Sequence, residues 1–174
     1  MGACDRHDRG GLVTADEELT IRAVIDTSTL VSPRLRRALQ QQAQLGTFEA
    51  IWSPWIVAEL NRVLVWRWLE RTGDDTSAAN ERACSASAKR MMDYLIASFT
   101  TVDPKPPYPW PWEGLADVWD HPVWAAAKMG GARYVVSENT RHYPRPAAGG
   151  WHAHEGIAYI GGDAFLTLLN DGLE

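Results

Sequence analysis

Apolar residues recur along the chain with two different spacings. Short, almost wholly apolar runs are typical of strands buried on both faces of a sheet, and they occupy residues 21–25, 48–52, 134–136 and 157–160, with a further short strand expected at 99–102. Between them, apolar side chains recur at the spacing of a helix, over residues 33–45, 54–72, 74–96 (as one helix or two), 119–129 and 163–169. This alternation predicts an α/β fold, with a parallel sheet covered by helices on both faces.

Local signals mark where several of these helices begin and end. Ser-Pro pairs stand at 32–33 and 53–54. A serine hydroxyl can cap the first turn, and proline suits the first helical position. Gly46 and Gly73 follow the first two helices, where a left-handed residue commonly ends a helix. Asp163 is expected to cap the last helix.

Other segments lack such periodicity. Residues 1–19 are rich in Gly, Asp and Arg and predict a flexible N-terminal extension. Residues 20–174 then form a single domain, as expected for a chain of 174 residues. The proline-dense stretch 104–112 excludes a helix and predicts an extended surface loop. Residues 144–155 are expected to form another loop.

Most of the nine tryptophans fall into two groups. Two belong to the proline-rich loop and are expected to be exposed: Trp110 and Trp112. Six lie in periodic segments and are expected to pack in the core: Trp52, Trp55, Trp66, Trp68, Trp119 and Trp124.

The composition narrows the possible functions. With 45% hydrophobic and 22% charged residues, the chain is globular rather than disordered. A net charge of −5 argues against sequence-independent coating of DNA but leaves room for a local basic groove. Two cysteines without metal-ligand spacing, no long apolar run and a polar N-terminus predict a cytoplasmic protein with no structural zinc, disulfide framework or membrane span.

Acidic residues gather where ligands bind in such a fold, outside the carboxyl ends of the strands. Asp26 and Glu138 directly follow predicted strands. Glu59 lies in the first turns of the helix after the second strand. Asp120 heads another helix, and Asp117 precedes it by three residues. We therefore expect four or five carboxylates to converge on one edge of the sheet.

Such a cluster has a chemical consequence. Carboxylates packed together repel one another unless a cation compensates them. Oxygen ligands without Cys or His favour Mg²⁺ or Mn²⁺. These ions hold phosphate oxygens and lower the pKa of a bound water, so a phosphodiester is the natural substrate.

Three segments resemble PIN-domain nucleases, and most closely the VapC-like toxins of bacterial toxin–antitoxin pairs. They are Val24-Ile25-Asp26-Thr27-Ser28, Ile56-Val57-Ala58-Glu59-Leu60, and residues 120–127 with 131–139. The likeness spans residues 21 to about 170. It implies a three-layer α/β/α fold with about five parallel strands, and Mg²⁺- or Mn²⁺-dependent cleavage of single-stranded RNA. It also implies homodimers and a cognate antitoxin.

The resemblance also assigns roles by position. The carboxylates that it makes catalytic metal ligands are Asp26, Glu59, Asp120 and, at the variable fourth position, Glu138, with Asp117 as a competing ligand. Ser28 would orient the cluster, and Ser137 would supply the hydroxyl before the fourth acid. Arg141, close to Glu138, is a candidate phosphate contact.

Simpler interpretations of the same residues remain open. Asp26 could begin a turn, Glu59 could be a solvated helix residue, and Asp120 could serve only as a helix cap. Two other functions also stay open. One is a non-catalytic binding module that keeps the PIN scaffold. The other is a haloacid-dehalogenase-like phosphatase, which would need a second aspartate where Ser28 stands.

Overall fold

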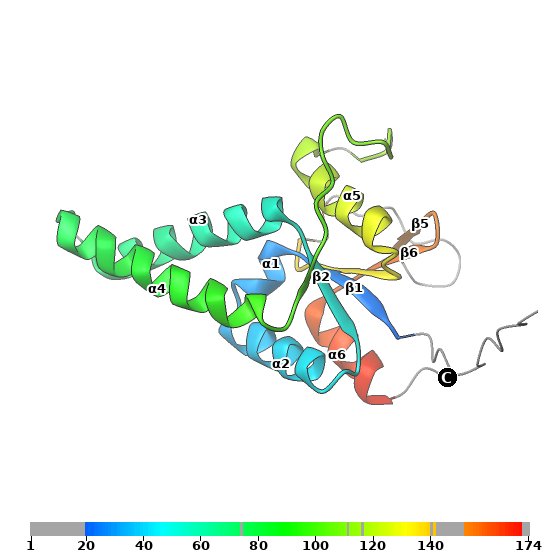
Figure 1. The fold of residues 1–174 in the computed structure, drawn as a ribbon, viewed down its shortest axis with the longest axis horizontal. Coiled ribbons are helices and arrows are strands. Elements are labelled where there is room, and N and C mark those ends of the chain that lie inside the picture. Colours follow the sequence, from blue (N-terminus) through cyan, green and yellow to red (C-terminus); the bar gives the residue numbers. More distant parts are fainter. Residues whose placement is uncertain are drawn as a thin grey trace, which may run out of the picture.

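The computed structural model describes residues 20–73, 75–110, 112–115, 117–139, 141 and 152–171. In these residues, helices cover both faces of a six-stranded sheet (Figure 1). This three-layer α/β/α arrangement confirms the fold class predicted from the sequence. The expected N-terminal extension, and most of the expected loop at 144–155, lie outside the described residues.

The sheet has the strand order β3-β2-β1-β4-β6-β5. Its strands are β1 Arg22–Ile25, β2 Glu49–Trp52, β3 Thr100–Thr101, β4 Tyr134–Val136, β5 His152–His154 and β6 Ile157–Ile160. Near the middle, Val24 of β1 lies opposite Ile51 of β2 and Val135 of β4. All neighbouring strands pair in parallel except β5, which is antiparallel to β6. The carboxyl ends of the parallel strands therefore share one edge.

The sixth strand departs from the expectation of about five. Residues 152–154 fall in the loop predicted at 144–155, yet they form β5 at the border of the sheet. This strand is three residues long and contains two histidines, so it lacks the apolar run that marks a buried strand. Backbone pairing with β6 alone defines it.

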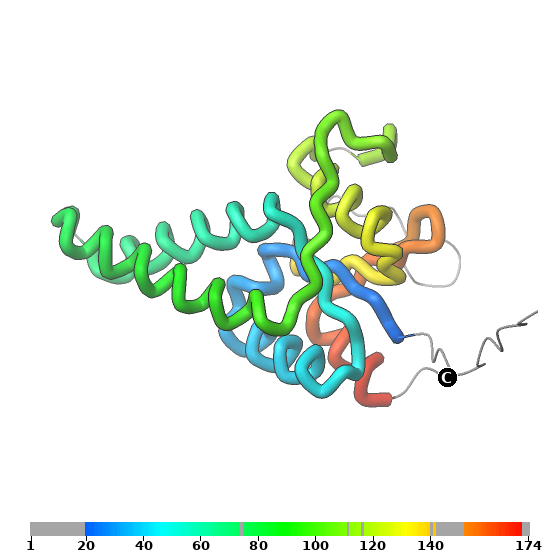
Figure 2. The backbone as a smooth tube through the Cα atoms, viewed as in Figure 1, coloured from blue at the N-terminus to red at the C-terminus, as the bar shows by residue number. Residues whose placement is uncertain are grey.

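The helices are α1 Thr27–Leu30, α2 Pro33–Gln44, α3 Pro54–Arg71, α4 Ala78–Ile96, α5 His121–Gly130 and α6 Gly162–Asp171, with the 3-10 helix η1 Val118–Asp120 before α5. α2 and α6 lie together on one face of the sheet, and α5 covers the other (Figure 1). α3 and α4 form a pair that projects from the body (Figure 2). None of the described helices combines the length and apolar character that crossing a membrane requires.

Most of the predicted boundary signals are confirmed. The Ser32 and Ser53 hydroxyls cap α2 and α3, each accepting a backbone N–H at 3.4 Å. Gly46 and Gly73 follow these helices with positive φ angles of 75° and 64°, a conformation that glycine adopts without strain. The prediction for Asp163 is wrong, because α6 begins one residue earlier and places this side chain inside the first turn.

Three of the six tryptophans predicted in the core are partly or largely exposed: Trp55, Trp66 and Trp119, by 36%, 56% and 65%. The buried stripe of α3 consists of Ile56, Leu60 and Leu64. Trp55 and Trp66 lie outside this stripe and face solvent, whereas Trp68 of the same helix packs against the core. The other three predicted core tryptophans lie in the core or pack against it.

The proline-rich segment packs against the body, contrary to the prediction of an exposed tryptophan pair. Trp112 is buried, and its ring stacks on His154 with centroids 4.1 Å apart. The same ring lies 5.1 Å from that of Trp124. The Trp124 indole N–H donates to the Trp110 carbonyl at 3.0 Å, and Trp110 is partly buried. Partners remote in sequence thus bury rings that the prolines alone suggested were exposed.

Candidate functional site

A groove of about 940 Å³ opens where the parallel strands end. Its acidic lining comes from the end of β1, from α3 and from the segment at η1: Asp26, Glu59, Asp117 and Asp120. Asn139, which follows β4, adds a side-chain amide. The larger lining side chains are Trp55, Trp119, Arg62 and Arg67. The structure therefore brings four of the five predicted acids to one groove.

Asp26 is fixed at the end of β1. Its backbone N–H donates to the Val136 carbonyl of β4 at 2.9 Å, which ties it to the neighbouring strand. Its Oδ1 atom accepts the Thr27 N–H at 2.7 Å and so caps α1. Its Oδ2 atom accepts the hydroxyls of Ser28 at 2.6 Å and Ser137 at 2.7 Å. The aspartate thus does begin a short helix, and its carboxylate is held in one orientation.

The two serines form a connected pair. The Ser28 oxygen accepts the Glu138 N–H at 2.9 Å, and the Ser137 oxygen accepts the Asn139 N–H at 3.1 Å. Each hydroxyl has one proton to donate. When both hydroxyls donate their protons to Asp26, no proton lies between the two serine oxygens, which are 2.9 Å apart. Both serines predicted to orient the acids therefore contact Asp26.

Glu59 occupies the second turn of α3 and is half-buried. Burial raises the pKa of its carboxyl, and the charges of Asp26 and Asp120 raise it further. The Thr27 hydroxyl and the Arg62 guanidinium act in the opposite direction. The ionised form of Glu59 is therefore disfavoured until positive charge enters the groove.

The two aspartates near η1 have different local roles. Asp117 caps η1, because its carboxylate accepts the Trp119 N–H at 2.9 Å. Asp120 stands at the start of α5 and makes no capping hydrogen bond to that helix. Its position is therefore not explained by capping, and its carboxylate lines the groove.

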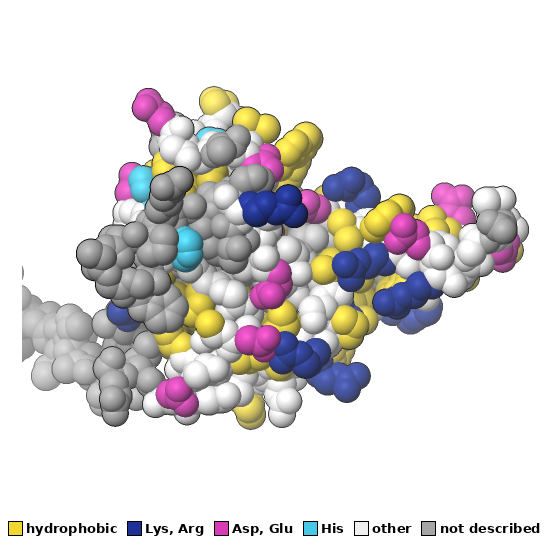
Figure 3. Space-filling model, turned by 180° about the vertical axis from the view of Figure 1, so that it is seen from behind, with side chains coloured by type: hydrophobic (Ala, Val, Ile, Leu, Met, Phe, Trp, Pro, Cys, Tyr) yellow, Lys and Arg dark blue, Asp and Glu magenta, His cyan; other side chains and the backbone are white. Residues whose placement is uncertain are grey.

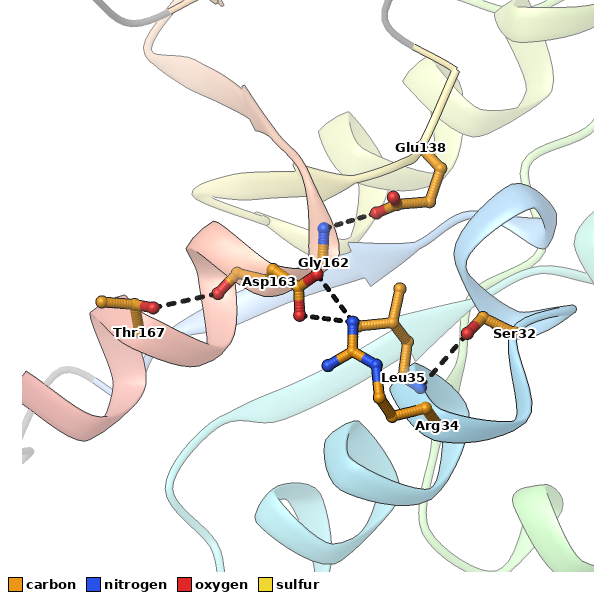
Figure 4. Close-up of polar contacts among 7 residues, drawn as sticks. All are labelled: Ser32, Arg34, Leu35, Glu138, Gly162, Asp163 and Thr167. Carbon is orange, nitrogen blue, oxygen red and sulfur yellow. Dashed lines mark hydrogen bonds and ion pairs between the residues drawn. The ribbon is translucent and has the colours of Figure 1, made fainter.

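Glu138 is not brought to the groove. It is exposed, and its Oε1 atom accepts the Gly162 N–H at 2.6 Å, at the first residue of α6 (Figure 4). Asn139 lines the groove instead. Side chains along an extended segment alternate in direction, so Ser137 and Asn139 share a side and Glu138 points elsewhere. This alternation can be read from the sequence, and it predicts that Asn139 rather than Glu138 lies on the same side as Ser137. Arg141 is exposed and is not among the residues that line the groove.

The side chains of the groove fit a divalent cation by donor type. Four carboxylates and an amide form an all-oxygen set, which suits Mg²⁺ or Mn²⁺. The carboxylates lie further apart than the ligands of a formed metal site. In the part of the chain that the structure describes, no three Asp, Glu, His or Cys side chains are close enough together to hold a metal ion. Side-chain rotation is therefore needed before three carboxylates can share one ion.

A mostly parallel α/β sheet with acids gathered at the carboxyl ends of its parallel strands is an arrangement compatible with metal-assisted phosphodiester chemistry. Comparison with protein families makes the assignment specific: a family model described as the PIN domain matches residues 22–141. The chain therefore belongs to the PIN-domain family, whose members are generally nucleases and typically use divalent metals. This membership argues against the haloacid-dehalogenase-like phosphatase. That enzyme would need an aspartate at position 28, where this chain has a serine.

Similarity to known proteins is otherwise distant. The fold resembles the crystal structure of PAE2754 from Pyrobaculum aerophilum, with a TM-score of 0.54 and 14% sequence identity. That likeness covers 87% of this chain and 97% of the other. At this identity it supports the fold alone. None of the curated proteins compared with the chain matches it.

Proposed function

We propose that this protein is a Mg²⁺- or Mn²⁺-dependent endoribonuclease that cleaves single-stranded regions of RNA, and that it is the cytoplasmic toxin of a toxin–antitoxin pair. The supporting observation is the meeting of Asp26, Glu59, Asp117 and Asp120 in one groove of a PIN-domain fold. A divalent ion bound there would supply Lewis-acid chemistry and lower the pKa of a bound water.

The chain's own residues divide the remaining work. Asp26, locked by two hydroxyls and a backbone N–H, provides a fixed reference point. Glu59 from α3 and Asp120 from η1 complete the negative pocket. The Asn139 amide can donate to a phosphate oxygen, a contact that neighbouring carboxylates cannot make. In-line attack by water would then leave a 5′-phosphate and a 3′-hydroxyl.

The direct test is a cleavage assay on a panel of structured RNAs with Mg²⁺, Mn²⁺ or EDTA. The wild-type protein should cut unpaired segments with either metal, and EDTA should abolish cutting. Asp120→Asn removes one carboxylate with little change in shape and should lose most of the activity. Equal cutting by both proteins would identify a contaminant. Products that end in a 2′,3′-cyclic phosphate would exclude the proposed chemistry.

A second candidate is a binding module that keeps the scaffold without catalysis. It is favoured by the looseness of the acidic cluster in the described residues and by the outward turn of Glu138. Titration with Mn²⁺ in a calorimeter separates the two functions. Heat from the wild type that is lost in Asp26→Asn supports the nuclease, and no heat from either protein supports the module.

The proposed toxin role carries two partner predictions. An antitoxin should cover the groove, and an arginine inserted among the carboxylates would match their charge and geometry. The protein itself should form a homodimer. Sedimentation velocity of the purified protein tests the dimer, and a single monomeric species over the accessible concentrations would rule it out. A small antitoxin-like reading frame beside the gene would support the first prediction.

A further inference from the structure

A stacked pair of tryptophans stands beside the acids. The Trp55 and Trp119 rings are 5.5 Å apart between centroids, with 22° between their planes. Both line the groove. Trp119 is 65% exposed. Large aromatic side chains usually gain their stabilisation by burial, so an exposed stacked pair within the groove is typical of a binding surface.

The sequence ties these rings to the acids. Trp55 lies four residues before Glu59, one turn away on the same side of α3. Trp119 directly precedes Asp120. Each ring thus shares an element with a groove acid, and the contact between the rings links the start of α3 to η1. The rings therefore have a fixed position relative to the acidic cluster.

One face of Trp119 remains available. Trp55 covers the other face, so the 65% exposure of Trp119 must come mainly from the open face and the edges of the indole. A flat heterocycle placed there would extend the stack from two rings to three. Nucleobases stack on indole in this way without regard to sequence, provided that they are not paired in a duplex.

Two arginines continue the groove along α3. Arg62 and Arg67 line it beyond Glu59. At a helical rise of 1.5 Å per residue, Arg67 lies about 12 Å further along the helix axis than Glu59. Figure 3 shows Lys and Arg side chains gathered where the projecting helix pair leaves the body. Guanidinium groups at such intervals suit a chain of phosphates.

We propose that Trp119, supported by Trp55, is the base-binding platform of this groove. An unpaired base of a single-stranded nucleic acid stacks on its open face, while Arg62 and Arg67 contact phosphates of the same strand. The neighbouring sugar–phosphate linkage is then presented to the acids. This inference rests on the proposed nuclease function, and it adds the residues that select single strands.

Equilibrium binding tests the platform without requiring cleavage. The probe is a short, fluorescently labelled single-stranded oligonucleotide, followed by anisotropy in EDTA at fixed salt. Trp119→Ala should raise Kd roughly 5- to 150-fold, the range for loss of one base–aromatic stack. Trp119→Phe keeps a ring and should recover part of this loss. Tyr94→Ala removes an aromatic side chain that is 58% exposed but lies outside the groove, and it should bind like the wild type.

Changes in the probe isolate the stacking. A strand of abasic sites keeps the phosphates and lacks the bases, so wild type and Trp119→Ala should bind it equally. A duplex of the same sequence should bind more weakly than the single strand. Matched RNA and DNA strands identify the ligand: equal losses on both indicate single strands in general, and a loss on RNA alone indicates RNA. Wild-type affinity in Trp119→Ala, or an unchanged loss on the abasic strand, would overturn the platform.

Cleavage kinetics separate this proposal from the nuclease itself. If the protein cuts RNA, Trp119→Ala should raise KM more than it lowers kcat. Active protein with an unchanged KM in this variant would refute the platform and leave the nuclease standing. A wild type that cuts no RNA, yet shows the predicted binding pattern, would refute the nuclease and leave the platform standing. Because Trp119 is largely exposed, the melting temperature of the variant should match the wild type.

Discussion

Removal of the Ser137 hydroxyl should destabilise the fold and disturb the groove together. This side chain is 4% exposed and donates to the Asp26 carboxylate at 2.7 Å. A hydrogen bond to a charged group contributes about 1.5–3 kcal/mol to stability. The variant also loses the 3.1 Å hydrogen bond from the Asn139 N–H to the Ser137 oxygen. This loss adds little to the destabilisation, because Asn139 is only half-buried and its N–H can bind water instead. We therefore expect Ser137→Ala to lower the free energy of unfolding by about 2 kcal/mol.

Urea unfolding monitored by tryptophan fluorescence measures this change, and thermal unfolding should show a fall in Tm of about 4–8 °C. Ser28→Ala should cost less, since Ser28 is less buried. Because both hydroxyls bind the same Asp26 oxygen, the double variant should deviate from additivity by at least about 0.5 kcal/mol. Ser85→Ala on the exposed side of α4 is the control. A Ser137→Ala variant no less stable than this control would refute the structural role of the serine pair.

Three further predictions concern other parts of the molecule. Burial raises the pKa of Glu59, so its protonated form favours folding. That contribution is present below the unfolded pKa, near pH 4, and is lost as the pH rises through the folded value. Glu59→Gln should therefore be more stable than wild type at neutral pH without divalent ions, but not at pH 3. If the urea midpoints of the two proteins differed by the same amount at both pH values, this reasoning would be contradicted. Gly162→Ala would place a Cβ atom 2.8 Å from Leu35 Cδ1, so it should cost about 1–3 kcal/mol in urea unfolding; wild-type stability would show that the contact relaxes freely. Arg67→Ala should reduce the salt dependence of oligonucleotide binding by roughly 0.7 in the log–log slope, whereas Arg71→Ala, outside the groove, should not; equal slopes for both would argue against a phosphate contact.

The sequence predicts those parts of the molecule that depend on neighbouring residues. The Ser-Pro signals locate the starts of α2 and α3 because a cap is a contact within one turn. The position of Asp26 at the end of a buried strand follows from the same local logic. The strand alternation that separates Glu138 from Asn139 is also local, whereas the family resemblance assigns the fourth acid to Glu138 by its position in the sequence alone.

Long-range packing explains what the sequence did not reveal. Trp112 is buried because His154, from a distant strand, stacks on its ring. Trp55 and Trp119 meet although 64 positions separate them, and nothing in either segment signals that contact. The edge strand β5 depends on its pairing with β6 rather than on its own residues. In each case, a residue or strand that is distant in the sequence determines the burial, the ring contact or the strand pairing, and the local sequence does not.

The projecting helix pair carries one of the groove acids, Glu59, near its inner end. α3 is 18 residues long, so its outer end lies about 27 Å from Ser53, whereas Glu59 lies only about 9 Å away. If the helix pivots as a rigid rod at its first turn, a sideways shift of about 3 Å at Arg71 moves Glu59 by about 1 Å. Metal–ligand distances vary by only about 0.2 Å. Under such a pivot, a molecule bound at the outer end of the helix pair would change the distance between Glu59 and the other acids without touching the groove.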